Sequence, residues 1–95
     1  MSTRVVKEMG LRPDEFFHWL PGAAGGMPWR RVNGGAVLGV AGRAVTISLE
    51  PLPERRIANV TMPVTRVVLD FDGMDAEETA AFLMRFDRAY HRGGG

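Results

Sequence analysis

The last third of the chain, residues 66–95, constrains the fold most, because a strand pattern leads through a glycine turn into a capped helix. From Arg66 to Asp72 apolar residues recur at every second position, which is typical of a strand with one buried face. Gly73 marks the turn, and Asp75 with Glu78 three residues later matches a capping box. We therefore predict a strand followed directly by a helix.

This helix is predicted to run from Asp75 to about His91. Gly93 suits a left-handed helix cap, and we expect residues 93–95 to be a frayed tail. One side of the helix carries a stripe at helical spacing, made of Thr79, Phe82, Leu83, Phe86 and Tyr90. Such a stripe predicts a face that packs on a core.

The first third is less regular. Residues 1–10 leave open whether a short strand or the start of a helix forms. A short helix is predicted after Leu11, because Pro13 suits a first helical turn and Pro21-Gly22 ends the element. Residues 22–35 carry five glycines, and we predict a flexible Gly-rich loop there.

The middle of the chain alternates with a period of two. Ala36–Val40 and Ala44–Glu50 predict a hairpin, and Arg56–Met62 predicts a third strand beyond a proline break at residues 51–54. With residues 66–72 the order becomes αββββα. We predict one α+β domain over residues 1–95, in which a short N-terminal and a longer C-terminal helix pack on one face of a three- to four-stranded antiparallel meander.

Composition excludes several classes of protein. The chain has no cysteine, which removes disulfides, thiolate nucleophiles and Cys-ligated metals and fits a reducing cytoplasm. No apolar stretch approaches the ~20 residues of a membrane span, and no signal peptide is recognised, so we expect a soluble, cytoplasmic protein. Arginine together with abundant Ala and Gly is typical of a GC-rich bacterial genome.

The segment Leu69-Asp70-Phe71-Asp72-Gly73 resembles the nucleophile loop of haloacid-dehalogenase-type phosphatases. The resemblance implies Asp70 as the attacking carboxylate, Asp72 as the acid/base and a bound magnesium ion. In that family the loop begins a large parallel sheet, whereas here a single helix follows it, and the later catalytic residues have no place. We therefore interpret the two aspartates as the polar face of a strand.

No catalytic, cofactor or metal site is predicted. His18 has only Asp14 and Glu15 at helical spacing, whereas a structural metal site needs about four ligands. His91 is explained by the favourable interaction of a basic group with a helix C-terminus.

Nucleic-acid binding, with RNA as the ligand, is an alternative to a protein partner. Every basic residue except Lys7 is an arginine, yet the net charge is only +1. The αββββα order is similar to small RNA-binding modules, but the last helix begins with acidic residues that would repel phosphate. The arginines of this alternative are Arg30, Arg31, Arg43, Arg55, Arg56 and Arg66.

The leading hypothesis is a non-enzymatic accessory or protein-interaction domain. Trp29, Arg30 and Arg31 lie in the Gly-rich segment and have the composition of an interface hot spot. An alternative for Trp29 is that its side chain folds back on the core. The partner would be another protein, or a second copy that pairs through an exposed sheet edge.

Overall fold

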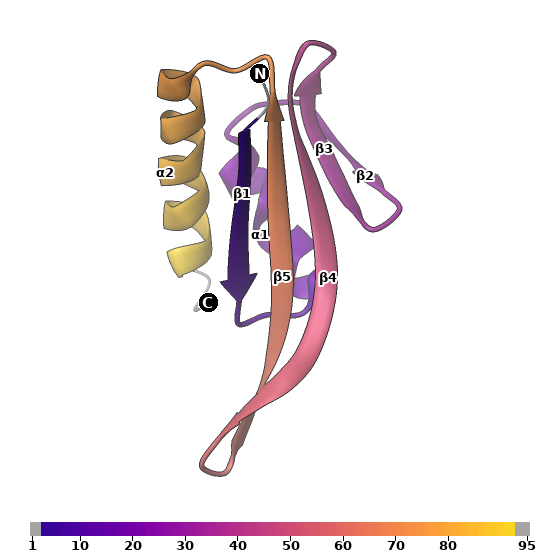
Figure 1. The fold of residues 1–95 in the computed structure, drawn as a ribbon, viewed down its shortest axis with the longest axis vertical. Helices are drawn as coiled ribbons and strands as arrows, with labels where there is room; N and C mark the ends of the chain where they lie inside the picture. The colour runs from indigo at the N-terminus through magenta and orange to yellow at the C-terminus, as the bar shows by residue number, and fades with distance from the viewer. Residues whose placement is uncertain (1–2, 93–95) are drawn as a thin grey trace.

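The computed structural model describes residues 3–92, so the predicted cap at Gly93 and the tail 93–95 lie outside the described residues. The α+β class is confirmed, with one antiparallel sheet of five strands instead of three or four, in the order β1-β5-β4-β3-β2 (Figure 1). Residues 1–10, left open between strand and helix, contribute the first strand. The elements are β1 (Thr3–Met9), α1 (Pro13–Ala24), β2 (Trp29–Val32), β3 (Gly35–Val40), β4 (Arg43–Ile57), β5 (Val60–Asp72) and α2 (Ala76–Arg92).

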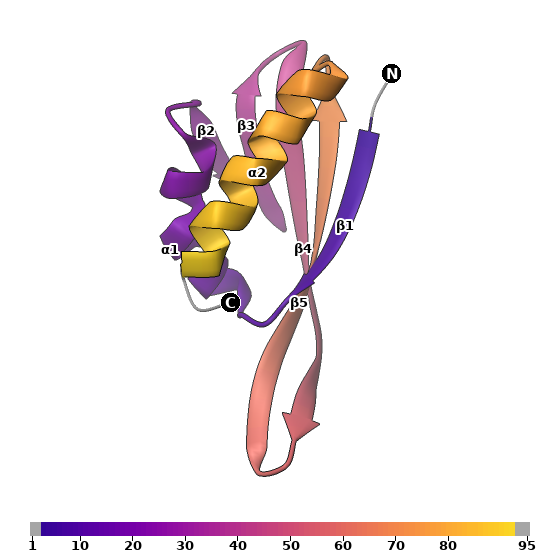
Figure 2. The same cartoon turned by 90° about the vertical axis from the view of Figure 1, so that its left-hand side faces the viewer.

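Both helices pack against one face of the sheet, and the other face is open (Figure 2). Side chains alternate between the two faces along each strand, so Val45 and Ile47 share the helix-facing side with their register partners Phe71 and Leu69. The core joins these strands to both helices. Its largest fully buried side chains include Phe16, Leu20, Leu38, Ile47, Leu69, Phe71, Phe82 and Phe86.

The capping box predicted for α2 is confirmed. The Glu78 backbone N–H donates to Asp75 Oδ1 at 2.8 Å, and the Asp75 N–H donates to Glu78 Oε1 at 3.1 Å. At the other end the Tyr90 hydroxyl donates to the Phe16 carbonyl oxygen at 2.8 Å, which ties α2 to α1. Neither described helix is both long and apolar enough to cross a membrane.

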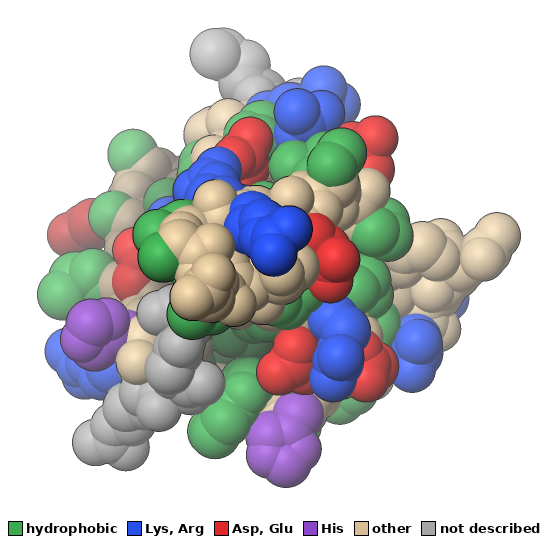
Figure 3. Space-filling model, turned by 90° about the horizontal axis from the view of Figure 1, so that it is seen from below, with side chains coloured by type: hydrophobic (Ala, Val, Ile, Leu, Met, Phe, Trp, Pro, Cys, Tyr) green, Lys and Arg blue, Asp and Glu red, His purple; other side chains and the backbone are tan. Residues whose placement is uncertain are grey.

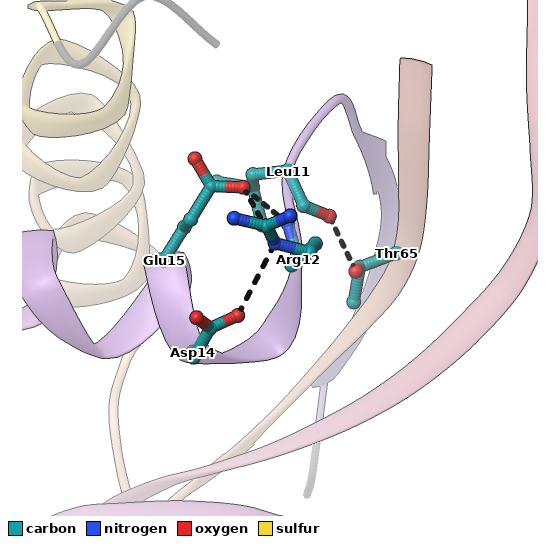
Figure 4. A network of polar contacts seen from close by, with 5 residues as sticks. All are labelled: Leu11, Arg12, Asp14, Glu15 and Thr65. Carbon is teal, nitrogen blue, oxygen red and sulfur yellow. Dashed lines mark hydrogen bonds and ion pairs between the residues drawn. The ribbon is translucent and has the colours of Figure 1, made fainter. Parts of the chain in front are cut away.

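A polar network holds the start of α1 (Figure 4). The Arg12 N–H donates to Glu15 Oε1 at 3.0 Å, and the Arg12 guanidinium lies 3.6 Å from Asp14 Oδ1. From β5 the buried Thr65 hydroxyl donates to the Leu11 carbonyl oxygen at 2.6 Å. The turn between β1 and α1 is therefore fastened to β5, the strand next to β1.

The Gly-rich loop expected at residues 22–35 is wrong in extent. α1 continues through Pro21 to Ala24 because Ala23 and Ala24 are buried, and it ends at Gly25 in the left-handed conformation, φ 59°. Residues 29–32 form β2 instead of loop and pair with β3 through a two-residue turn at Asn33-Gly34.

The third strand expected at residues 56–62 is also wrong, because the chain turns within it at Ala58-Asn59. β4 continues through Pro51 and Pro53 to Ile57, with a register irregularity between Leu52 and Arg55 that accommodates the prolines. The result is a two-stranded arm, residues 51–64, that projects from the rest of the molecule (Figure 1). The predicted strand at residues 66–72 is confirmed as the second half of β5.

Candidate interaction surface

β2 lies at one edge of the sheet and pairs only with β3 among the described strands. Trp29 is opposite Leu38 and Arg31 is opposite Ala36, and both of these β3 residues are buried beneath the helices. Trp29 and Arg31 therefore lie on the helix-facing side of the sheet. Arg30, between them, lies on the open side because successive side chains of a strand point to opposite faces.

An aromatic and cationic cluster covers the helix-facing side of β2. The Phe17 ring from α1 stacks on Trp29 with centroids 6.5 Å apart, and it meets the core residue Phe16 edge-on at 5.7 Å. The Arg31 guanidinium lies 4.1 Å from the centroid of the Phe17 ring, within the range of a cation–π contact. We call Phe17, Trp29 and Arg31 the β2 cluster.

The β2 cluster is partly open to solvent. Trp29 is 36% exposed and Arg31 is exposed, while Phe17 is half-buried and packs on the core. Trp29 therefore neither folds fully into the core nor extends freely into solvent. Phe17 packs on the core and holds the Trp29 indole and the Arg31 guanidinium in place. Side chains that are already held lose less entropy when a partner binds.

Of the three candidate residues, the structure brings Trp29 and Arg31 together and separates Arg30 from them by the thickness of the sheet. It adds Phe17, which the sequence analysis did not single out. Phe17 follows the core residue Phe16 on a helix, so its ring points about 100° away from that of Phe16, toward the border of the buried face. A second aromatic at the border of a helix is the signal that could have identified it.

The arginines of the nucleic-acid alternative do not gather on one surface. Arg31 and Arg43 belong to the helix-facing side, whereas Arg30 and Arg66 belong to the open side. Figure 3 shows acidic and basic side chains interspersed over the face at the arm end. Three of these arginines form ion pairs, namely Arg43 with Glu78, Arg55 with Glu8 at 3.6 Å and Arg66 with Glu50 at 3.2 Å.

Asp70 and Asp72 both lie on the open side of β5, in register with Thr46 and Ala44 of β4. Asp70 Oδ1 accepts a hydrogen bond from Arg4 Nε at 2.9 Å. Within residues 3–92, no group of three or more His, Asp or Glu side chains is arranged to hold a metal ion. The two aspartates therefore occupy the polar strand face that their alternation predicts.

Burial raises the pKa of the Tyr90 hydroxyl, because ionisation would place a charge in the core. This hydroxyl is already committed to the Phe16 carbonyl, so it is a structural group. Comparisons with family models, with curated proteins and with solved structures found no match to this chain.

Proposed function

We propose that this chain is a non-enzymatic protein-interaction domain that binds an extended segment of another protein along the free edge of β2. The observation that carries the proposal is the β2 cluster, a half-exposed Trp29 and Arg31 held by Phe17 beside a strand edge that no described residue pairs with. Extended peptides bind such edges by adding a strand, so that main-chain hydrogen bonds give affinity and alternate side chains give specificity.

The cluster also indicates the chemistry of the segment. A strand added beside β2 would direct alternate side chains toward Trp29 and Arg31, and the others toward Arg30 and Val32 on the open side. None of the ion pairs between described side chains involves Arg30 or Arg31. An apolar side chain of the bound segment would pack on the Trp29 indole. An acidic side chain on each face of the sheet would pair with Arg31 and with Arg30. We therefore expect an extended segment that mixes apolar and acidic residues.

Selection from a displayed library of random linear peptides tests the proposal. We expect selected peptides to contain apolar residues flanked by Asp or Glu, and to lose at least roughly tenfold in affinity for Trp29→Ala, since interface tryptophans typically contribute more than about 1.4 kcal/mol. Arg31→Ala should weaken binding in a salt-dependent way.

The chain supplies a matched control. Trp19 on α1 is also 36% exposed, and it contacts His18 instead of the β2 cluster. Trp19→Ala should leave peptide binding unchanged. Peptides that lose binding to Trp19→Ala but not to Trp29→Ala, or a selection that yields no peptide, would reject β2 as the binding edge.

A further inference from the structure

β1 is the opposite edge of the sheet and is unusually open. Its seven residues pair with β5 one by one, from Thr3↔Phe71 to Met9↔Thr65, without a register shift. None of the described residues pairs with its outer side, and it contains no proline or glycine. Natural edge strands are usually blocked by such a residue, by a bulge or by charged side chains. β1 has no proline, glycine or bulge, and its charged residues, Arg4, Lys7 and Glu8, are of both signs. The outer row of backbone groups along β1 is thus a complete template for another strand.

The open-side side chains of β1 are complementary to themselves. If two copies of β1 run antiparallel about a two-fold axis through Val6, Arg4 of one copy lies opposite Glu8 of the other, and Val6 lies opposite Val6. Val6 is 55% exposed and lies on the open side of the sheet with Arg4 and Glu8. Opposite charges and apolar pairs at directly opposed positions stabilise strand pairing.

Neighbouring registers are worse. A two-fold axis through Lys7 would place two lysines against each other, and an axis through Val5 would pair only residues 3–7. The axis through Val6 alone combines the full seven-residue overlap with opposite charges. A two-fold axis perpendicular to the sheet requires paired residues to share a face, so it excludes axes that fall between residues.

We propose that β1 is a homodimerisation edge, where two copies join their sheets into one through antiparallel β1 strands centred on Val6. The charges then alternate in sign across the junction. Within one chain Glu50, Arg66 and Glu8 are neighbours across three strands. In the dimer Glu8 lies opposite Arg4 of the second copy, which is in turn the neighbour of Asp70 in that copy. This match of the strand to its own charges favours a second copy over an unrelated strand.

The flank of β1 is incompletely covered within one chain. A hollow of about 500 Å³ lies between β1 and the last turns of α2, lined in part by Lys7, Met9, Asp87 and Tyr90. The Lys7 ammonium lies 3.0 Å from Asp87 Oδ1 of α2, and this ion pair holds the Lys7 side chain on the helix-facing side. The open side of β1 therefore carries only Arg4, Val6 and Glu8. The proposal concerns the edge opposite β2 and does not depend on the function proposed for β2.

A single introduced cysteine tests the register, because the natural chain has none. Directly opposed strand residues have Cα atoms about 4.5–5.5 Å apart, within the roughly 4.4–6.8 Å span of a disulfide. Under mild oxidation, Val6→Cys should form a covalent dimer at low micromolar protein. Thr46→Cys, exposed on the same open side but on the interior strand β4, is the control. Equal cross-linking of both variants would overturn the proposal.

Charge reversal tests the partner. Arg4→Glu alone places two carboxylates opposite each other at each Arg4–Glu8 pair of the dimer, and Glu8→Arg alone places two guanidinium groups there. Each variant should raise the dimer Kd by roughly tenfold or more. In an equimolar mixture, a dimer of two unlike copies has opposite charges at both of these pairs, so sedimentation velocity and native mass spectrometry should detect a heterodimer. Circular dichroism melts would confirm that each variant folds.

Failure of the mixture to form heterodimers, or a wild-type chain that sediments as a monomer at every concentration, would overturn the proposal. The peptide selection at β2 distinguishes the two proposals, because Arg4→Glu should leave peptide affinity unchanged and Trp29→Ala should leave the dimer intact.

Discussion

The two edges of the sheet differ in length and in the side chains that surround their free backbone groups. β1 has seven residues, and its open-side charges Arg4 and Glu8 each form an ion pair within the chain, with Asp70 and Arg55. β2 has four residues, and its helix-facing side chains stack on Phe17 of α1. For the long edge with both signs of charge we propose pairing with its own copy. For the short edge with an aromatic and two arginines we propose a different, acidic partner.

In these two proposals, the length of an edge strand and the side chains around it determine which partner it binds. Both strands offer the same unpaired N–H and C=O groups, so the backbone cannot distinguish their partners. α1 connects the two edges in sequence, and its buried face lies at the centre of the core. Changes in and around α1 therefore test whether the edges depend on one core or on separate local supports.

Removal of the Phe16 ring should have the largest effect. This side chain is fully buried and contacts Phe17, Phe86 and Tyr90. Phe16→Ala should lower the free energy of unfolding by about 3–5 kcal/mol in chemical denaturation. Amide exchange should then quicken at both edges, since α1 follows β1 and precedes β2. Loss of protection at only one edge would contradict a shared core.

Removal of the Thr65 hydroxyl should have a smaller effect that is confined to β1. Thr65→Val leaves the Leu11 carbonyl without its 2.6 Å donor and should cost about 1–3 kcal/mol. Hydrogen exchange should quicken near Met9 and Leu11 and stay unchanged in β2. Thr46→Val, on the exposed side of β4, is the matched control and should change stability by less than about 0.5 kcal/mol.

Alkaline pH should weaken both edges through the link between α1 and α2. Tyr90 is the only tyrosine, and burial raises the pKa of its hydroxyl. Above about pH 10 the unfolded chain loses the Tyr90 hydroxyl proton, whereas the native chain keeps it. The Tyr90 contribution to stability is thus complete below about pH 10 and falls by roughly 1.4 kcal/mol per pH unit above it.

Tyrosinate absorbance measures this directly, because one residue carries the whole signal. Ionisation should coincide with unfolding detected by circular dichroism, and in Tyr90→Phe stability should lack this component of the alkaline slope. Ionisation of Tyr90 in a chain that stays folded would contradict the role of its hydroxyl bond to Phe16.

Local signals in the sequence predicted part of this fold well. The capping box of α2 depends on residues three apart, and the core stripe through Phe82, Phe86 and Tyr90 depends on one helical period, so both can be recognised without the rest of the chain. The hairpin turn at Asn33-Gly34 was also a recognisable signal. The glycines around it indicate a loop and obscure this turn signal.

The arm could not be predicted from local signals. Its turn uses Ala58 in the left-handed region, φ 53°, where glycine or asparagine is the usual choice. Its prolines indicate strand ends, yet a two-stranded arm tolerates them because each strand has a free edge. For the β2 cluster, composition identified Trp29 and Arg31. The position of Arg30 on the opposite face follows only once residues 29–32 are recognised as a strand.

Neutralising Lys7 should have the smallest effect on stability and a specific effect on β1. The Lys7–Asp87 ion pair is partly exposed, so Lys7→Met should change the free energy of unfolding by less than about 1 kcal/mol, and the difference should shrink in high salt. In the proposed dimer, Lys7 also excludes the register in which two lysines meet. Lys7→Met should therefore allow slipped pairing and reduce cross-linking through Val6→Cys. Undiminished cross-linking would show that Arg4 and Glu8 alone set the register. Peptide binding at β2 should be unaffected in either case.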